Sequence, residues 1–163
     1  MKIIPKFFSK EECFNLILLH RKKVKTALTV EHGYSPTIRK TKVFIWSHDV
    51  NLENKFESSP MVFQFAEYSI LDHYAWHNDY ATHNDRKRIE TCIINLNEEY
   101  VGGEFELADH GKIKLNVGDC LRFDSRIEHK VHSVTKGKRY SLTGWVYEPY
   151  SIEKLMRGEE KIE

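Results

Sequence analysis

The chain has 163 residues with 25 Lys and Arg against 24 Asp and Glu, a length typical of one domain with a single core. Its net charge of +1, spread along the chain in both signs, argues against a general nucleic-acid binder. Because no apolar stretch approaches a membrane span and the start has no cleavage pattern, we expect residues 1–163 to form one domain without membrane attachment.

The three cysteines are Cys13, Cys92 and Cys120. They are widely spaced and contain no CxxC pair, so the sequence predicts neither a disulfide framework nor a thiolate zinc site. Free cysteines of this kind fit a reducing compartment, and we expect the protein to be cytoplasmic.

The N-terminal segment predicts a short strand followed by a helix. Lys2–Phe7 can form the strand, and Ser9 with Glu12 three residues later is a capping-box pattern at a helix start. We expect this helix to run to about Lys25. Its inward-facing residues at helical spacing are Cys13, Leu16, Ile17 and His20.

After Gly33 the sequence is rich in short β segments separated by Gly-containing turns. The expected strands are Thr37–Trp46, Met61–Trp76, Arg88–Leu96, Glu104–Leu107, Lys112–Leu115, Cys120–Phe123, His129–Val134 and Arg139–Tyr147. Residues 47–60 and 80–87 are polar enough to be long loops, and both are candidate lids. Many short strands with turns between them predict a mainly β fold, a sandwich or jelly roll with its core over residues 61–149.

The tripeptide His77-Asn78-Asp79 follows a strand-like run, where side chains two apart share a face. An imidazole and a carboxylate would therefore project to the same side. His129 can supply a third group, and two histidines with one carboxylate form a facial triad that leaves positions open on iron. His132 is the rival to His129, but two residues three apart on a strand face opposite sides unless the strand is bulged.

An anion clamp is predicted ten residues after His129. Arg139 and Ser141 alternate along one strand and share a face, so a guanidinium and a hydroxyl can hold the far end of a dicarboxylate together. A buried Arg needs such an anion, and its planar fork suits a carboxylate. The remaining histidines, His73, His83 and His110, are expected on the surface or behind the ligands.

The stretch from Tyr68 to Trp145 resembles the prolyl 4-hydroxylase branch of the 2-oxoglutarate oxygenases. The family element Y-x-x-G-x-x-Y-x-x-H-x-D is matched by Tyr68, Leu71, Tyr74, His77 and Asp79, with Leu71 in place of glycine. The segment RIETCIINLN and the turn EEYVGGEFEL resemble the central strand and the turn after it. The segment GDCLRFDSRIEHKVHSVTKGKRYSLTGW resembles the closing part of the family pattern.

This resemblance implies a double-stranded β-helix, a cupin-like jelly roll, with the N-terminal helix packed outside it. It implies iron ligation by His77, Asp79 and His129, and binding of the C5 carboxylate of 2-oxoglutarate by Arg139 with Ser141. The implied cofactors are Fe(II), 2-oxoglutarate and O2, with ascorbate as a supporting reductant. Further implied contacts are Tyr68, Tyr74 and Asn95 toward the oxoacid, and Trp145 toward the substrate. Tyr80 is a second candidate for the substrate groove because it is aromatic and directly follows the tripeptide.

The expected function is hydroxylation of an unactivated C–H bond, with a prolyl residue of a peptide or protein as the first candidate substrate. A free amino acid or a small metabolite stays open. Nucleic acid is not expected, because demethylases of the superfamily carry a second Arg where this chain has Trp145. From another class, a cupin-like metal-binding or ligand-binding barrel without activity is the alternative, although such a barrel has no need for the clamp at Arg139.

Overall fold

The computed structural model describes residues 1–29, 33, 35–58, 61–83, 86–149, 151, 156 and 157. Within these residues it contains the helices α1 (Lys10–His20) and α2 (Val50–Phe56). The strands are β1 (Lys2–Ile4), β2 (Lys25–Thr26), β3 (Arg39–Lys40), β4 (Lys42–Ser47), β5 (Met61–Tyr68), β6 (His73–His77), β7 (Thr82–His83), β8 (Arg86–Asn95), β9 (Tyr100–Gly102), β10 (Phe105–Leu107), β11 (Gly111–Ile113), β12 (Cys120–Asp124), β13 (His129–Val131), β14 (Val134–Gly137) and β15 (Arg139–Tyr147).

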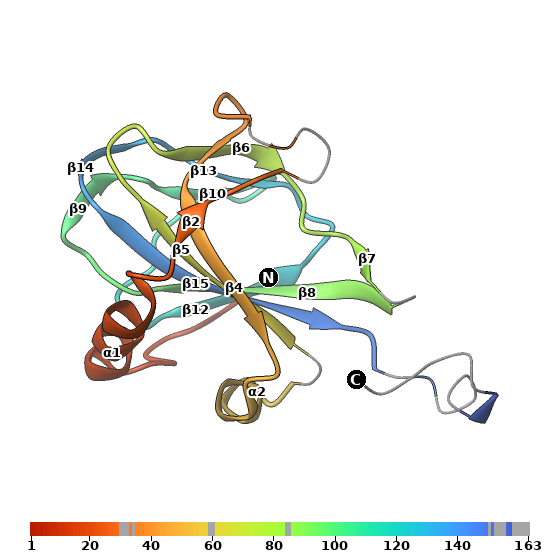
Figure 1. Cartoon of the computed structure of the whole chain (residues 1–163). Coiled ribbons are helices and arrows are strands. Elements are labelled where there is room, and N and C mark those ends of the chain that lie inside the picture. The colour runs from red at the N-terminus through yellow and green to blue at the C-terminus, as the bar shows by residue number, and fades with distance from the viewer. Residues whose placement is uncertain are drawn as a thin grey trace.

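Two antiparallel sheets face each other across the molecule (Figure 1). Among the described strands, the larger sheet has the order β1-β12-β8-β15-β5-β4-β2, with β7 paired to β8, and the smaller has the order β11-β10-β13-β6-β3. The chain crosses repeatedly between the two sheets, as in a double-stranded β-helix. The predicted fold class, mainly β with few helices, is confirmed.

Successive side chains of β5 and β15 point to opposite faces of the larger sheet, and two hydrophobic clusters lie on these two faces. Phe63, Phe65 and Leu142 pack on the outer side of the larger sheet, in a cluster that also contains helix residues. Tyr68 on β5 packs between the two sheets, in a cluster that also contains Val131 of β13. Burying each large apolar side chain contributes about 1.5–3 kcal/mol, so this alternation fixes which residues face the interior.

Helix α1 begins as the sequence predicts and ends earlier. The Glu12 backbone N–H donates to Ser9 Oγ at 3.1 Å, and the Ser9 backbone N–H donates to Glu12 Oε2 at 2.7 Å, which completes the capping box. The helix ends at His20, and the predicted extension to Lys25 is wrong because Lys25–Thr26 leaves the helix to pair with β4. Figure 1 places α1 and α2 on the same outer side of the larger sheet.

Helix α2 lies within the segment that we expected to be a loop. Asp49 caps it by accepting from the Leu52 backbone N–H at 3.1 Å, and Leu52 and Phe56, one helical turn apart, are buried in the outer cluster. The expectation of an open loop over residues 47–60 is therefore wrong for residues 50–56. In the second expected loop, residues 82 and 83 pair with the start of β8.

Three of the predicted strands are interrupted. Met61–Trp76 is split into β5 and β6 at a turn in which the Ser69 backbone N–H donates to Asp72 Oδ2 at 2.9 Å. Leu71, which replaces the family glycine, has a φ of +68° in this turn, a conformation that glycine adopts without strain. Thr37–Trp46 is likewise split into β3 and β4, and His129–Val134 into β13 and β14.

Neither described helix has the length and apolar composition that a membrane crossing requires.

Candidate metal centre and its cavity

Neighbouring strands bring the two candidate histidines together. Strand β6 ends at His77 and β13 begins at His129, and these residues are direct partners in the antiparallel register. Asp79 lies two residues beyond β6, and its backbone N–H donates to the Ser125 carbonyl at 2.9 Å, just after β12. Directly opposed residues on antiparallel strands have Cα atoms about 4.5–5.5 Å apart, so the strand register places both imidazoles at one point.

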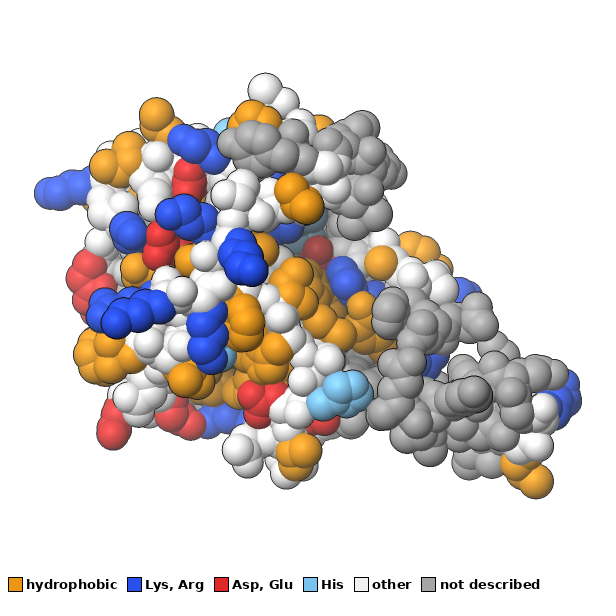
Figure 2. Space-filling model, viewed as in Figure 1, with side chains coloured by type: hydrophobic (Ala, Val, Ile, Leu, Met, Phe, Trp, Pro, Cys, Tyr) orange, Lys and Arg blue, Asp and Glu red, His pale blue; other side chains and the backbone are white. Residues whose placement is uncertain are grey.

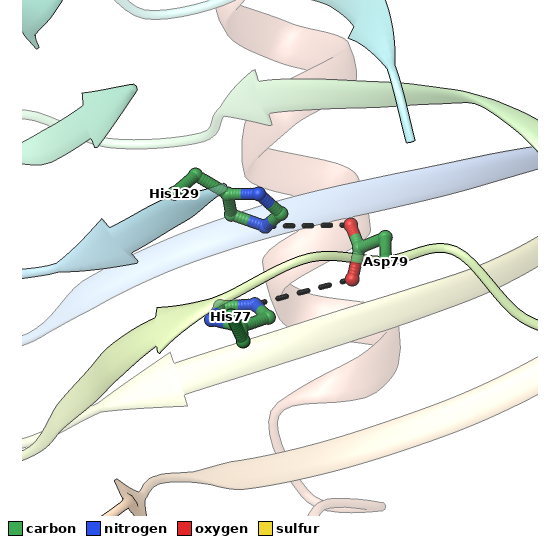
Figure 3. Close-up of side chains that lie close together, drawn as sticks. All are labelled: His77, Asp79 and His129. Atoms are coloured by element: carbon green, nitrogen blue, oxygen red, sulfur yellow. Dashed lines mark ion pairs between the residues drawn. The ribbon is translucent and has the colours of Figure 1, made fainter. Parts of the chain in front are cut away.

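The three side chains turn toward one another (Figure 3). Nε2 of His129 lies 3.4 Å from one carboxylate oxygen of Asp79, and Nε2 of His77 lies 3.9 Å from the other. The Nδ1 atom of His77 lies 2.8 Å from the Ala75 carbonyl, and that of His129 lies 3.1 Å from the Ile127 carbonyl. A ring that donates from Nδ1 leaves the lone pair of Nε2 directed at the shared point, as in metal-ligating histidines.

The electrostatics of this group suit a metal cation. Burial and the neighbouring His129 lower the pKa of His77 to about 3, so the imidazole is neutral at neutral pH. Burial alone would raise the pKa of Asp79, but a hydrogen bond from His129 and Coulombic interactions with His129 and His77 outweigh it and hold the pKa low. Two imidazoles and a carboxylate, with ligand atoms within 4.8 Å of one another, form the donor set of a facial triad.

Behind Asp79 lies a buried hydroxyl pair that the sequence analysis did not identify. Thr91 Oγ1 donates to Asp79 Oδ2 at 3.0 Å and lies 2.9 Å from Ser125 Oγ, and both hydroxyl residues are fully buried. The Thr91 hydroxyl therefore holds the same carboxylate oxygen that lies 3.4 Å from His129 Nε2. The local signal was weak: a polar residue directly before the apolar run Cys92–Ile94.

Arg139 and Ser141 lie side by side on β15, the strand that pairs with both β5 and β8. Arg139 is 3% exposed, its Nη1 donates to Ser141 Oγ at 3.2 Å, and its guanidinium lies 5.4 Å from the centre of the Tyr68 ring. No Asp or Glu pairs with this guanidinium in the described part of the chain. A buried cation without an anion is unfavourable, which fits a site for a carboxylate ligand.

One cavity of about 290 Å³ joins the triad to this clamp. Figure 2 shows a recess on the face viewed, with an acidic side chain at its base and Lys or Arg side chains beside it. Tyr68, Tyr74, Tyr80 and Trp145 line the cavity. Tyr74 also stacks on His77, with ring centres 3.4 Å apart.

The cavity lining also includes Arg39, Gln64 and Arg88. Arg88 Nη1 donates to the Asp79 carbonyl at 3.0 Å, and its guanidinium lies 4.1 Å from the centre of the Trp145 ring. The sequence analysis assigned no role to any of the three, because their partners come from distant strands.

Asn95 does not reach this cavity. Its Nδ2 donates to the Asn97 and Leu115 carbonyls, and its Oδ1 accepts from the Tyr100 hydroxyl at 3.1 Å. Asn95 instead lines a second cavity of about 390 Å³, which Arg139 also borders. Both polar atoms of the Asn95 amide are therefore hydrogen-bonded to other parts of the protein.

Among the histidines with described side chains, His132, His73 and His110 are not part of the triad. His132 follows β13 and its Nε2 lies 2.6 Å from Glu106 Oε2, while Nε2 of His73 lies 3.2 Å from the Thr37 carbonyl. His110 is exposed in the turn before β11. The side chain of His83 lies outside the described part of the chain.

Curated relatives of the chain are hydroxylases of one type. It is similar to a PKHD-type hydroxylase of Psychrobacter sp. (strain PRwf-1), with 32% identity over 108 residues, covering 60% of this chain and 39% of the relative. It is also similar to a PKHD-type hydroxylase of Janthinobacterium sp. (strain Marseille), with 36% identity over 93 residues, covering 50% of this chain and 41% of the relative. The chain thus spans about two fifths of the length of these relatives.

Solved structures with the same fold include a prolyl-4-hydroxylase of Pseudomonas putida, at a TM-score of 0.74 and 19% identity, covering 90% of this chain and 92% of that one. Another is a prolyl hydroxylase of Trichoplax adhaerens in complex with a hypoxia inducible factor peptide fragment, at a TM-score of 0.72 and 18% identity, covering 90% and 82%. These similarities and the hydroxylase relatives confirm the predicted resemblance to the prolyl 4-hydroxylase-like branch.

A family model described as the 2OG-Fe(II) oxygenase superfamily matches residues 63–147, which span β5 to β15 and contain the triad, Arg139 and Ser141. This match covers just over half of the chain. The chain therefore belongs to the 2OG-Fe(II) oxygenase superfamily.

Proposed function

We propose that this protein is a dioxygenase that uses Fe(II) and 2-oxoglutarate to hydroxylate an unactivated C–H bond. One observation carries the proposal: two histidines and a carboxylate meet in the same cavity as a buried guanidinium that lacks an anionic partner among the described residues. A metal-binding barrel without activity would have no use for that second group.

In this proposal His77, Asp79 and His129 hold the iron. When bound, Fe(II) with 2-oxoglutarate and O2 supplies the oxidising power: one oxygen atom enters the substrate, the other enters succinate, and carbon dioxide leaves. Three protein ligands leave open positions for the co-substrate and oxygen. The Thr91 hydroxyl holds Asp79 in place, and the backbone bonds at each Nδ1 fix the tautomer of the histidines.

The remaining residues of the cavity orient the co-substrate and exclude water. Arg139 and Ser141 bind the distal carboxylate of 2-oxoglutarate, because a guanidinium and a hydroxyl together match its two oxygens. Tyr68 packs beside the guanidinium and can donate a hydroxyl to the oxoacid. Trp145 and Tyr80 line the part of the cavity that receives the substrate.

The first candidate substrate is a prolyl residue of a peptide or protein. The similarity to solved prolyl hydroxylases, one of them in complex with a peptide, supports this choice. A free amino acid or small metabolite is the alternative. The three cysteines are buried and free, which fits a reducing cytoplasm.

The test is release of succinate from 2-oxoglutarate with Fe(II) and ascorbate, coupled to a mass-spectrometric search for a gain of one oxygen. The search covers proline-containing peptides and a free amino-acid panel. We expect turnover with at least one class. Absence of succinate under every condition, including uncoupled turnover without substrate, would favour the binding barrel.

Replacing Arg139 tests the clamp separately from the metal site. Because a charge-assisted hydrogen bond contributes about 1.5–3 kcal/mol, Arg139→Ala should weaken 2-oxoglutarate binding by about ten- to a hundredfold while iron affinity stays nearly unchanged. Arg139→Lys serves as a second variant that keeps the charge and most of the volume. If iron binding fell as far as 2-oxoglutarate binding in both variants, the clamp assignment would be wrong.

A further inference from the structure

A second guanidinium, that of Arg39, is buried in the wall of the same cavity. Arg39 is 8% exposed, and its Nη2 donates to Gln64 Oε1 at 2.9 Å. The guanidinium lies 4.4 Å from the centre of the Tyr74 ring. Its Nε is buried without a hydrogen-bond partner among the described residues. An amide and an aromatic face do not neutralise a buried cation, so the observed partners leave this group unsatisfied.

Other arginines of the protein show how such a charge is usually accommodated. Arg122 pairs with Glu90, and Arg126 pairs with Asp124. In the cavity itself, Arg88 donates to the Asp79 carbonyl and to the Tyr147 hydroxyl at 2.9 Å. Arg39 has no carboxylate in the described part of the chain.

The charge balance of the cavity also indicates that an anionic partner is missing. Its described lining contains three guanidinium groups, of Arg39, Arg88 and Arg139, and one carboxylate, of Asp79. The guanidinium groups therefore outnumber the carboxylate by two among these residues. Fe(II) would add two positive charges and 2-oxoglutarate two negative charges, so the surplus would persist after both have bound. A further anion in the cavity would offset it.

Arg39 also lies next to the candidate ligands, and its guanidinium reaches β5 at Gln64, four residues from the Tyr68 that pairs with Arg139. It is the direct register partner of Tyr74, whose ring stacks on His77. Strand β3 belongs to the smaller sheet, whereas Arg139 lies on the larger sheet. An anion bound at Arg39 would therefore be close to the metal position and separate from the distal end of 2-oxoglutarate.

We propose that Arg39, supported by Gln64, binds a carboxylate of the primary substrate close to the carbon that is hydroxylated. The substrate class is then a free amino acid or the C-terminal residue of a peptide, which share an α-carboxylate. This inference rests on the proposed function.

The experiment measures binding rather than turnover. Isothermal titration is done without oxygen on the protein saturated with Fe(II) and 2-oxoglutarate, so that Arg139 is occupied. The titrants are matched acid and amide pairs: the free amino acids and their amides, and short proline-containing peptides with free or amidated C-termini. The protein variants are Arg39→Gln, Arg39→Lys and, as a control, Arg21→Gln, which removes an exposed cation at the end of α1.

We expect at least one acid to bind the wild type about ten- to a hundredfold more tightly than its amide, the range of a charge-assisted hydrogen bond. Arg39→Gln should abolish this preference, Arg39→Lys should retain part of it, and Arg21→Gln should leave it unchanged. Free amino acids and peptide C-termini are separate arms, so the preferred arm identifies the source of the carboxylate.

The proposal is overturned if no acid binds better than its amide, including the case in which neither binds, or if the preference survives in Arg39→Gln. It is also overturned if Arg39→Gln loses 2-oxoglutarate affinity instead, since Arg39 would then belong to the co-substrate site. Failure of the proposed function is distinguishable, because it would appear as a wild type that binds neither Fe(II) nor 2-oxoglutarate.

Discussion

The Asp79 carboxylate is held by residues that do not touch the metal position. Thr91 Oγ1 is 3.0 Å from the carboxylate and 2.9 Å from Ser125 Oγ, and the Asp79 backbone is bonded to the Ser125 carbonyl. Partners of this kind orient a ligand and raise metal affinity even though they make no bond to the metal. Thr91 is therefore a positioning residue.

Thr91→Val should lower Fe(II) affinity by about ten- to a hundredfold, because it keeps the shape of the side chain but removes the hydroxyl that holds Asp79. Titration with Fe(II) in the absence of oxygen measures the change. Thr91→Ser restores the hydroxyl and should recover most of the affinity. Equal affinity for the Val variant and the wild type would show that the hydroxyl does not position the carboxylate.

Gly103 lies where an added methyl group would press on the clamp. Its φ is +64°, and a Cβ atom there would lie 3.1 Å from Arg139 Cδ and 2.9 Å from Val134 Cγ2. Gly111 has a similar φ of +72° but nothing within 4 Å of the corresponding position. Alanine substitutions at the two glycines therefore share the backbone strain, but only the one at position 103 adds contact with Arg139.

Gly103→Ala and Gly111→Ala should each lose about 1–2 kcal/mol of stability, because an L-residue is strained in the left-handed region. Only Gly103→Ala should also weaken 2-oxoglutarate binding, because its methyl group displaces the Arg139 side chain. Denaturant unfolding and 2-oxoglutarate titration measure the two effects. A comparable loss of 2-oxoglutarate affinity in Gly111→Ala would contradict this explanation.

At the scale of elements, a carboxylate joins the two helices. Glu12 completes the capping box of α1, and its Oε1 lies 2.5 Å from Nζ of Lys55 on α2. The hydrogen bond from Lys55, followed by the one from the Ser9 backbone, lowers the pKa of Glu12. A carboxylate whose pKa is lower in the folded state stabilises it at pH values above the unfolded pKa, and this contribution is lost as the pH falls through the folded value.

Glu12→Gln should therefore be less stable than the wild type at pH 7, and the difference should shrink below the ordinary Glu pKa of about 4.3. Urea unfolding at pH 7 and at pH 3 measures it. Glu11→Gln is the control, because it removes a charge from the same helical turn without breaking either contact. A difference that stayed constant with pH would show that the Glu12 charge contributes nothing.

The elements that the sequence predicted well are those specified by local patterns. Ser9 and Glu12 indicate the start of α1, and the two-residue spacing of Arg139 and Ser141 indicates one face of β15. Helix α2 was missed because its polar composition outweighed a local signal, the cap at Asp49 with Leu52 and Phe56 one turn apart. The division of Met61–Trp76 was missed because Leu71 occupies a turn position where the family has glycine.

In the candidate site too, residues specified by local patterns could be predicted, and residues that depend on distant partners could not. His77 with Asp79 could be identified from a tripeptide, and Arg139 with Ser141 from strand alternation. Thr91 and Arg39 could not, because their importance depends on partners in distant strands: Asp79 and Ser125 for the first, and Gln64 for the second. Such contacts arise from strand register, which a single sequence does not specify.

At the scale of the whole molecule, one face of the larger sheet packs against the helices and the other face carries the residues of the candidate site. Its outer side is covered by α1 and α2, and its inner side faces the cavity and the smaller sheet. We propose that residues 1–163 form one domain because both clusters share this sheet. The rigid strands on either side fix the clamp relative to the triad, which a proposed hydroxylase requires.

The most direct test of the central claim is Fe(II) titration, without oxygen, of the wild type, His129→Ala and His132→Ala, with folding verified by circular dichroism. We predict that the wild type binds a single Fe(II), that His129→Ala loses most of its iron affinity, and that His132→Ala, whose side chain pairs with Glu106, keeps it. Retention of iron by His129→Ala together with its loss in His132→Ala would contradict the assigned metal centre.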